Sequence, residues 1–288
     1  MRLQSFVPKR FAAALPVGLI ILLGLAPTFV DGVPSAAVGE APVGLGTAGS
    51  FGVLAGAGVT NTGPTIINGD LGTCPTPAIT GSPVVLPPGH IHANDAVACR
   101  AKLDLTTAFD DAAGRAPTKS YAGPTELGGL TLTPGVYETP TSFAITGTLT
   151  LNALGDPQAV FIFQAGSTLI TATDSRVMVI NGADACNVFW QVGSAATLGV
   201  GSTFVGTILA LDSIDALTNT TVHGRLLARN AAIRLDSNTV TAAVCATSPT
   251  SSTPESTAPD DSTPDDSTPD DSTPDDSTAE PTSAPTTA

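Results

Sequence analysis

The stretch NVFWQVGSAATLGVGSTFVG, residues 187–206, is followed by two others of the same pattern. They read TILALDSIDALTNTTVHG at 207–224 and RLLARNAAIRLDSNTVT at 225–241. The three stretches stack with a small correction in register, and each holds short runs rich in Val, Ile, Leu and Thr. A period of about 17 to 20 residues with three short strands is the length of one turn of a β-solenoid of roughly triangular section. The pattern therefore predicts a stack of parallel strands.

Two earlier stretches extend this repeat toward the N-terminus. AVFIFQAGSTLITATDSRVMVING at 159–182 is a longer version, and YETPTSFAITGTLTLNALG at 137–155 is a looser one. Side chains in neighbouring turns of such a stack form columns along its axis. Apolar columns are predicted to point inward, and the alignment places Phe204 with Val222 and Val240, and Leu198 with Ala216 and Leu235.

A polar column is predicted to face outward, and the alignment places Thr168, Thr197, Asp215 and Arg234 in it. Adjacent turns of a solenoid lie about 4.8 Å apart. Asp215 and Arg234 are therefore predicted to form a surface ion pair, which contributes about 0 to 1 kcal/mol to stability.

One helix is predicted, over about residues 93–113. Apolar residues recur there at steps of three or four, with charged residues between them: Val97, Ala101, Leu105, Ala108 and Ala112. The segment is followed by Gly114 and, soon after, Pro117, which commonly end helices. Its stripe of alanines predicts close packing against a flat surface.

Charge is distributed unevenly along the chain. Of the 288 residues, 42% are hydrophobic, 5% aromatic and 12% charged, and the formal net charge is -14. Residues 247–288 contain eight Asp and two Glu but no Lys or Arg, so most of the acidity belongs to this segment. The rest of the chain has no basic cluster to neutralise phosphates, and no nucleic-acid partner is expected.

The sequence divides into three parts. Residues 1–37 have basic residues, then the apolar run FAAALPVGLIILLGLA, then small residues, which is the order of a secretory signal peptide. That apolar run is shorter than the roughly 20 residues a membrane span needs. Residues 38–246 have the length of one domain. Residues 247–288 repeat STPDD and are predicted to be disordered. We therefore expect a secreted, extracellular protein with no membrane partner after cleavage.

Four cysteines become informative if the protein is exported. Cys74, Cys99, Cys186 and Cys245 allow three pairings in an oxidising compartment. Cys186 and Cys245 flank the three repeated turns, whose stacking distance of about 14 Å is close to the reach of residues 242–245, about 13 Å. A bridge between Cys186 and Cys245 is feasible and would leave Cys74 to pair with Cys99, although other pairings remain open.

Few residues suggest catalysis or metal binding. His90 and His92 have Asp95 as their one evident additional ligand, which is too few for a metal site, so no metal or cofactor is expected. A polysaccharide lyase on a parallel β-helix would need acidic metal ligands and basic residues in one groove. The candidates for such a groove are Asp212, Asp215, Arg225, Arg229, Arg234 and Asp236. Ion pairs along a solenoid wall are the simpler interpretation, and no enzyme is predicted.

Six segments carry a family resemblance and occur in order along the chain. They are FGVLAGAGVTNTGPTIINGDLGTCP at 51–75, AKLDLTTAFDDAAG at 101–114, GGLTLTPGVYETPTSFAITGTLTLN at 128–152, DPQAVFIFQAGSTLITA at 156–172, NVFWQVGSAATLG at 187–199 and GRLLARNAAIRLDSNTVT at 224–241. Together they resemble the microbial ice-binding protein family of the discontinuous β-solenoid type. The resemblance implies a mainly β fold, a right-handed triangular parallel β-solenoid with one long α-helix packed along its side. It also implies that the N-terminal turn packs beside the C-terminal one.

The resemblance further implies adsorption to ice through a flat wall rich in Thr, Ser and Gly. Threonine provides a hydroxyl that binds water and a stiff methyl group that shapes it. The candidate ice-binding residues fall at one place in successive turns: Thr146, Thr148, Thr171, Ala172, Thr173, Gly201, Ser202, Thr203, Thr218, Thr220, Thr221, Ser237 and Thr239. Tyrosine at Thr171 or Thr220 is expected to lower ice binding while leaving thermal stability nearly unchanged.

The family's ice-binding pattern, Thr-(Ala/Gly)-x-(Thr/Asn), is imperfect in this chain. Asp174 occupies the fourth position after Thr171, and Val200 stands where the next turn would begin with Thr. We expect a monomeric, non-enzymatic protein whose partner is the surface of ice and which has antifreeze and ice recrystallisation inhibition activity. The alternative is a cell-envelope or matrix adhesion module of the same fold.

Overall fold

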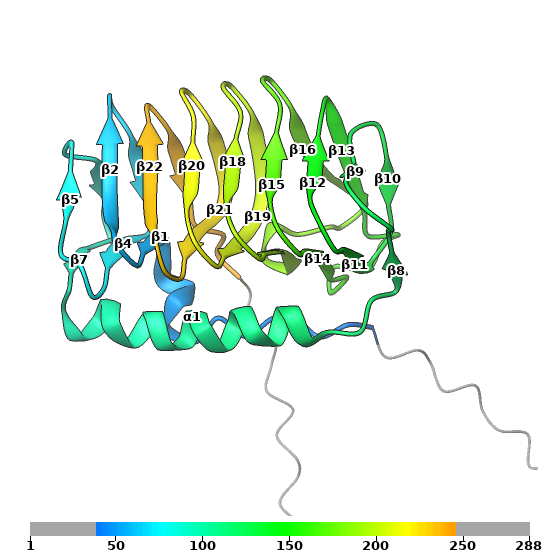
Figure 1. Ribbon diagram of the computed structural model, residues 1–288, viewed down its shortest axis with the longest axis horizontal. Helices are drawn as coiled ribbons and strands as arrows, with labels where there is room; N and C mark the ends of the chain where they lie inside the picture. Colours follow the sequence, from blue (N-terminus) through cyan, green and yellow to red (C-terminus); the bar gives the residue numbers. More distant parts are fainter. Residues whose placement is uncertain (1–38, 246–288) are drawn as a thin grey trace, which may run out of the picture. The chain divides into compact units, whose positions relative to one another are not determined.

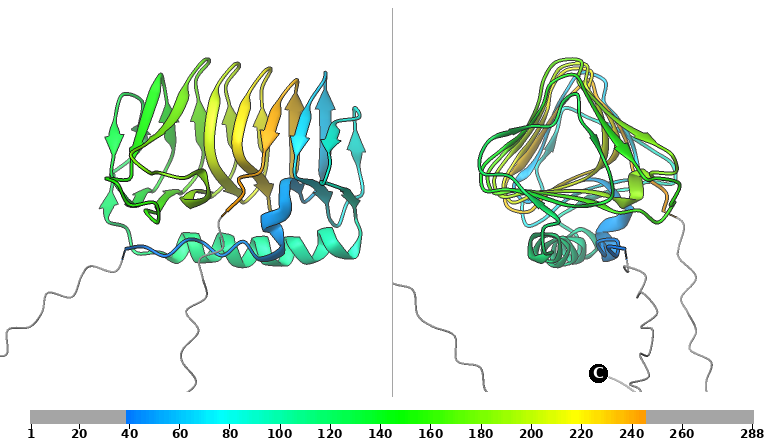
Figure 2. Two further views of the ribbon diagram at one scale, coloured as in Figure 1. Left: turned by 180° about the vertical axis from the view of Figure 1, so that it is seen from behind. Right: turned by 90° about the vertical axis from the view of Figure 1, so that its right-hand side faces the viewer.

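The described residues form a parallel β-solenoid with one long helix along its side (Figure 1). The computed structural model describes residues 39–245, so the predicted signal peptide and acidic tail lie outside it. Seen along its axis, the solenoid has a triangular section (Figure 2). The prediction of a mainly β, triangular solenoid with a helix packed along it is confirmed. No helix within the described range is long and apolar enough to cross a membrane.

The triangle has three faces, which we name from Figure 1. The front face consists of β5 (Ile79–Thr80), β2 (Gly58–Thr62), β22 (Ala232–Asp236), β20 (Ile214–Ala216), β18 (Ala196–Leu198), β15 (Leu169–Thr171), β12 (Phe143–Ile145) and β9 (Thr125–Glu126), in spatial order. The rear face consists of β6 (Val84–Leu86), β3 (Ile66–Asn68), β23 (Thr239–Thr241), the first parts of β21 (Thr221–Ala228) and β19 (Thr203–Ala210), β16 (Arg176–Ile180), β13 (Thr148–Asn152) and β10 (Thr131–Leu132).

The helix face completes the triangle. It consists of β7 (Ile91–Ala93), β4 (Asp70–Thr73), β1 (Phe51–Ala55), the second parts of β21 and β19, β17 (Val188–Val192), β14 (Phe161–Ala165), β11 (Gly135–Thr139) and β8 (Lys119–Ser120). Strands β19 and β21 turn the corner from the rear face at Gly206 and Gly224, which pair with each other. Both have positive φ, and a Cβ on Gly224 would lie 1.9 Å from the Gly206 carbonyl oxygen. Only glycine therefore suits this corner.

The order of turns in space differs from their order in sequence. The N-terminal turn, β1 to β3, pairs with the C-terminal turn through β1 with β21, β2 with β22, and β3 with β23. After β7 the chain returns along the helix face as α1 (Ala96–Gly114) and starts again at β8 on the opposite end (Figure 1). The discontinuous arrangement implied by the family resemblance is therefore present.

Helix α1 starts later than the predicted residue 93. Residues Ile91–Ala93 instead form β7, and Asn94 has a left-handed backbone with φ of 56°. Asp95 then caps the helix by accepting a hydrogen bond from the backbone N–H of Ala98 at 2.8 Å. One stripe of the helix is buried against outward-facing side chains of the helix face such as Leu54 and Ile162: Ala98, Ala101, Leu105, Ala108, Phe109 and Ala112.

Two short 3₁₀ segments and two disulfides complete the fold. Segment η1 (Gly46–Ser50) lies against α1, and η2 (Ala185–Asn187) precedes β17. Cys74 bonds to Cys99, and Cys186 bonds to Cys245. Of the three possible pairings, this is the one that follows from the predicted bridge between Cys186 and Cys245. One bridge ties the N-terminal turns to the start of α1, and the other ties the end of the domain to the middle of the stack.

The interior of the solenoid is a continuous apolar stack. Phe163 and Trp190 lie parallel with ring centroids 3.9 Å apart, and Tyr137 and Phe204 continue the row on either side. The predicted inward columns are confirmed, because Phe204 pairs with Val222 and then Val240, and Leu198 with Ala216 and then Leu235.

The predicted outward column is partly wrong. Thr197, Asp215 and Arg234 do share a column, and Arg234 Nη1 lies 3.0 Å from Asp215 Oδ1. The residue in the turn before Thr197 is Ile170, and Thr168 belongs to the neighbouring column. The turn between Ile170 and Thr197 is longer than the later turns because it includes η2. An alignment based on the length of the later turns therefore selects Thr168 instead of Ile170.

Lys102 fastens α1 to the end of β21. Its Nζ donates hydrogen bonds to the backbone carbonyl oxygens of Ala228 and Arg229. Burial of the ammonium lowers the pKa of Lys102 to about 8, and the nearby Arg229 guanidinium adds to the effect.

The free energy of unfolding of the domain is therefore predicted to rise as the pH increases from 7.5 to 9.5. The folded protein releases the Lys102 proton near pH 8, whereas the unfolded chain keeps it until about pH 10.4, so raising the pH from 7.5 to 9.5 favours the folded state by about 2 kcal/mol. Denaturant unfolding at the two pH values measures this rise, and Lys102→Met should abolish it. An equal rise in the variant would contradict the assignment.

Candidate functional site

The corner between the front and rear faces, which we call the apex, is built from a repeated tight turn. One residue in each turn has a left-handed backbone: Asp174 with φ of 57°, Gly201 with 67°, Asn219 with 61° and Ser237 with 54°. Gly, Asn and Asp tolerate this conformation better than other residues. In register, Asp174 therefore matches Gly201, Asn219 and Ser237. The expected alignment, in which Asp174 is fourth in a pattern that begins its next turn at Val200, is wrong, because the left-handed residue fixes the position of each turn.

A column of buried polar side chains lies just inside these turns. Its members are Thr65, Ser175, Ser202, Thr220 and Asn238, each at most 2% exposed. Thr220 Oγ1 lies 3.0 Å from the carbonyl oxygen of Gly199 and 2.8 Å from that of Leu217, so its single O–H proton is shared between these two acceptors. Asn238 Nδ2 also donates to Leu217, at 2.8 Å. These side chains satisfy backbone groups that the turns would otherwise leave buried without partners.

The structure brings all thirteen candidate ice-binding residues to the apex and the adjoining edges of the two faces. Three of them are buried: Thr171, Ser202 and Thr220. Thr171 Oγ1 accepts a hydrogen bond from the Gly199 N–H at 2.8 Å and contacts Ser202 Oγ at 3.5 Å. Their hydroxyls thus support the turns and cannot meet a surface outside. The expectation that tyrosine at Thr171 or Thr220 leaves stability unchanged is accordingly wrong.

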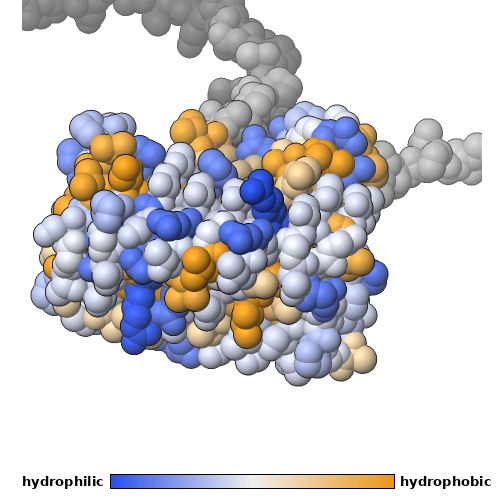
Figure 3. All heavy atoms as spheres, turned by 90° about the horizontal axis from the view of Figure 1, so that it is seen from above, coloured by the Kyte–Doolittle hydropathy of each residue, from blue (hydrophilic) through white to orange (hydrophobic). Residues whose placement is uncertain are grey.

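The other ten candidates have accessible side chains or backbone. Residues at the apex itself are Thr146, Ala172, Thr173, Gly201, Thr218 and Ser237, and those at the first position of the rear face are Thr148, Thr203, Thr221 and Thr239. Thr203, Thr221 and Thr239 pair in direct register across β19, β21 and β23. Viewed onto the apex, the surface is mostly of intermediate hydropathy, with separate hydrophilic and hydrophobic groups (Figure 3).

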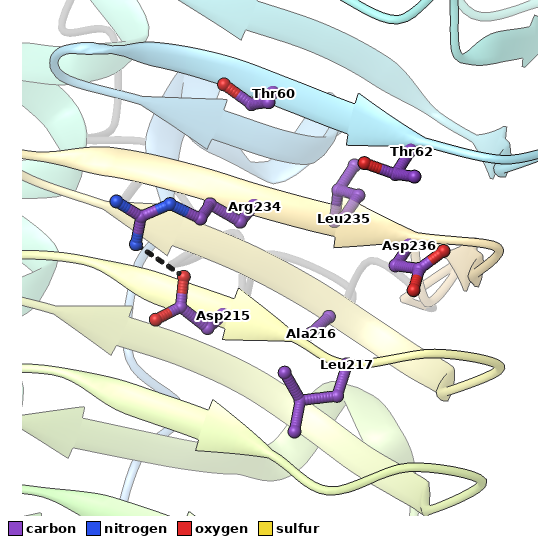
Figure 4. A pocket seen from close by; sticks show the side chains of 8 residues that line it. All are labelled: Thr60, Thr62, Asp215, Ala216, Leu217, Arg234, Leu235 and Asp236. Atoms are coloured by element: carbon purple, nitrogen blue, oxygen red, sulfur yellow. Dashed lines mark hydrogen bonds and ion pairs between the residues drawn. The ribbon is translucent and has the colours of Figure 1, made fainter.

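The surface of the front face is interrupted by charged side chains and by a hollow. It carries the Asp215–Arg234 ion pair and, beside it, a hollow of about 340 Å³. Figure 4 shows the side chains around the hollow in two rows that run across the neighbouring strands β20, β22 and β2. One row contains Asp215, Arg234 and Thr60, and the other contains Leu217, Asp236 and Thr62. Its lining residues are Thr60, Thr62, Asp215, Ala216, Leu217, Arg234, Leu235 and Asp236. Fixed charges here hold their own water, whereas Thr203, Thr221 and Thr239 follow one another on the rear face with no charged residue between them.

Three of the six residues considered for a lyase groove, Asp215, Arg234 and Asp236, line this hollow, but Arg225 and Arg229 lie elsewhere, so the six do not share one groove. Arg225 is buried and donates to the carbonyl oxygens of Gly49 and Ala243, while Arg229 pairs with Asp110 of the helix. Arg234 projects from the front face instead. The three arginines therefore serve three different regions of the fold.

The histidine pair forms a local contact at the start of the helix. His92 Nδ1 lies 2.7 Å from Asp95 Oδ2. The hydrogen bond from the Ala98 N–H and, after it, the contact with His92 lower the pKa of Asp95. Nowhere in residues 39–245 do three His, Cys, Asp or Glu side chains converge as a metal site would require.

The sequence is similar to that of known proteins over most of the solenoid. Residues 53–241 match the model of a family described as ice-binding-like. The chain is 50% identical over 206 residues to an ice-binding protein of Nostoc sp. (strain HG1), covering 71% of this chain and 76% of the relative. It is 37% identical over 223 residues to an ice-binding protein of Colwellia sp., covering 72% and 86%.

Solved structures agree with these sequence matches. One of an ice-binding protein from an Antarctic biological consortium superimposes with a TM-score of 0.68 at 44% identity, covering 73% of this chain and 95% of that one. Another, of an ice-binding protein from the Antarctic ascomycete Antarctomyces psychrotrophicus, gives a TM-score of 0.68 at 43% identity, covering 71% and 100%.

The buried apex column leads to a prediction about stability. Thr220→Val keeps the shape of the side chain but removes the O–H that serves the Gly199 and Leu217 carbonyl oxygens, and should lower the free energy of unfolding by about 1 to 2 kcal/mol. Thr221→Val, one residue along and half-buried, is the matched control and should change it by less than about 0.5 kcal/mol. Denaturant titration of both variants measures the difference, and equal effects would contradict a structural role for the Thr220 hydroxyl.

Proposed function

Because the chain belongs to the ice-binding-like family, we propose that it is a secreted protein that adsorbs to ice and limits the growth and recrystallisation of ice crystals. The observation that carries this proposal is the match of nearly the whole solenoid to that family. It is supported by the threonine column beside the apex, which consists of Thr203, Thr221 and Thr239. The predicted signal peptide and the two disulfides support export to an oxidising, extracellular environment.

Adsorption requires no catalytic residue, cofactor or second protein. Parallel turns repeat at about 4.8 Å along the axis, so the column presents hydroxyl and methyl groups at a fixed spacing. The methyl groups disfavour disordered water beside them, while each hydroxyl anchors one water by hydrogen bonding. A rigid array of this kind orders the adjacent water layer, and that layer can merge with the crystal.

We place the adsorbing surface at the apex and the adjoining edge of the rear face. Thr203, Thr221 and Thr239 have solvent-accessible side chains on that edge and succeed one another without an intervening charge. At the apex itself, the Thr146 and Thr218 hydroxyls donate to the carboxylates of Glu126 and Asp236. The front face supports the proposal less well, because the ion pair and the adjacent hollow interrupt its surface. A single copy of the domain offers this surface complete, so a monomer suffices.

The unaltered protein is predicted to bind ice measurably. In a solution frozen slowly around a cold surface, it should become enriched in the ice fraction, and growing crystals should become faceted. Crystals that remain featureless discs at high protein concentration would overturn the proposed function.

Two substitutions test the placement of the surface. Thr203→Tyr and Thr221→Tyr insert bulky rings that hold the surface away from ice, and each should reduce partitioning into ice. Thr197→Tyr on the front face is the matched control, since Thr197 is also a half-buried strand threonine. Stability should stay within about 0.5 kcal/mol for all three. Loss of binding in the Thr197 variant alone would place the surface on the front face instead.

A further inference from the structure

The threonine column continues beyond the residues that the sequence suggested. Strand pairing across the rear face connects seven positions on consecutive turns: Thr148, Arg176, Thr203, Thr221, Thr239, Ile66 and Val84. Ile66 and Val84 come from the N-terminal turns, which reach this column only because β3 packs against β23. We call this set the rear column.

Six of the seven residues in the rear column are β-branched. A β-branched side chain is stiff about χ1, so its methyl groups hold nearly fixed positions. Ile66 is 39% and Val84 50% exposed, so both apolar side chains reach solvent. The rear column therefore presents a regular line of methyl groups to solvent over most of its length.

Arg176 is the exception. It is exposed, and no salt bridge or side-chain hydrogen bond to another described residue holds it. A free guanidinium has five N–H donors on a long, flexible stem and remains hydrated. Arg176 thus separates Thr148 from the five β-branched residues that follow, from Thr203 to Val84.

We infer that Arg176 limits the ice-adsorbing surface of this chain to one side of the rear column. The inference rests on the proposed function, because it concerns how far that surface extends. The charge and mobility of Arg176 keep liquid-like water over the β13–β16 end of the column. A β-branched residue at this position would join all seven turns into one uninterrupted array.

Arg176→Thr is the direct test, and it should increase ice binding. One additional methyl group withdrawn from liquid water corresponds to about a fourfold change in a binding ratio, so the ratio of protein in ice to protein in liquid should rise about fourfold. The protein concentration that half-inhibits recrystallisation should fall correspondingly. Arg176→Lys keeps a mobile charge and should leave both values unchanged.

Arg234→Thr provides the matched control. It also replaces an exposed arginine on a strand and changes the net charge equally, but it lies on the front face. It should not raise ice binding. Thermal unfolding of the variants checks that each is folded. Arg176→Thr should alter stability by about 0.5 kcal/mol or less, and Arg234→Thr by up to about 1 kcal/mol, because it also removes the ion pair with Asp215.

The outcomes separate this inference from the proposed function. An unchanged Arg176→Thr variant, alongside reduced binding in Thr203→Tyr and Thr221→Tyr, would overturn the inference and leave the proposed function intact. Equal gains from Arg176→Thr and Arg234→Thr would also overturn it, because net charge rather than position would then be responsible. Absence of ice binding in the unaltered chain would overturn the proposed function itself.

Discussion

In-register pairing of parallel turns is the constraint on which every surface of this protein depends. Because side chains alternate between the two sides of a strand, a slip of one residue would move the interior column outward and the exposed column inward. The pairing is continuous across the junction between the last turn and the first, where Leu235 lies opposite Asn61 and Val240 opposite Ile67. The rear column exists only because this junction keeps the register of the turns on both sides.

Much of the fold can be predicted from sequence because the later turns have nearly equal lengths. Their alignment correctly paired Phe204 with Val222 and Asp215 with Arg234. It failed at Thr168, since the turn that contains η2 is longer and a period alone cannot locate the extra residues. Helix α1 was placed too early for a similar reason: local apolar spacing does not show that residues Ile91–Ala93 are needed as a strand beside β4.

The candidate site was harder to predict than the fold. At the apex, a buried hydroxyl and an exposed one stand side by side in sequence, as Thr220 and Thr221 do. Composition cannot separate them, because both positions favour small hydroxylated residues, one for satisfying turn carbonyls and the other for contact with water. The left-handed residue at Asn219 decides which hydroxyl turns inward. The sequence repeat also does not predict that Ile66 belongs to the rear column. Ile66 lies beside Thr239 only because the N-terminal turn packs against the C-terminal turn.

A surface that adsorbs to a crystal can be no more regular than the core beneath it. Each threonine of the rear column is followed in sequence by an inward residue, as Thr203 is by Phe204, so displacement of the core would displace the column as well. The stacked rings of Phe163 and Trp190, and the hydrogen bond from Trp190 Nε1 to the carbonyl oxygen of Val205 at 3.0 Å, hold the rear wall in place. Helix α1 covers the face opposite the apex and leaves the other two faces clear (Figure 2). The division of the triangle into one packed face and two open ones thus follows from the same register that aligns the threonines.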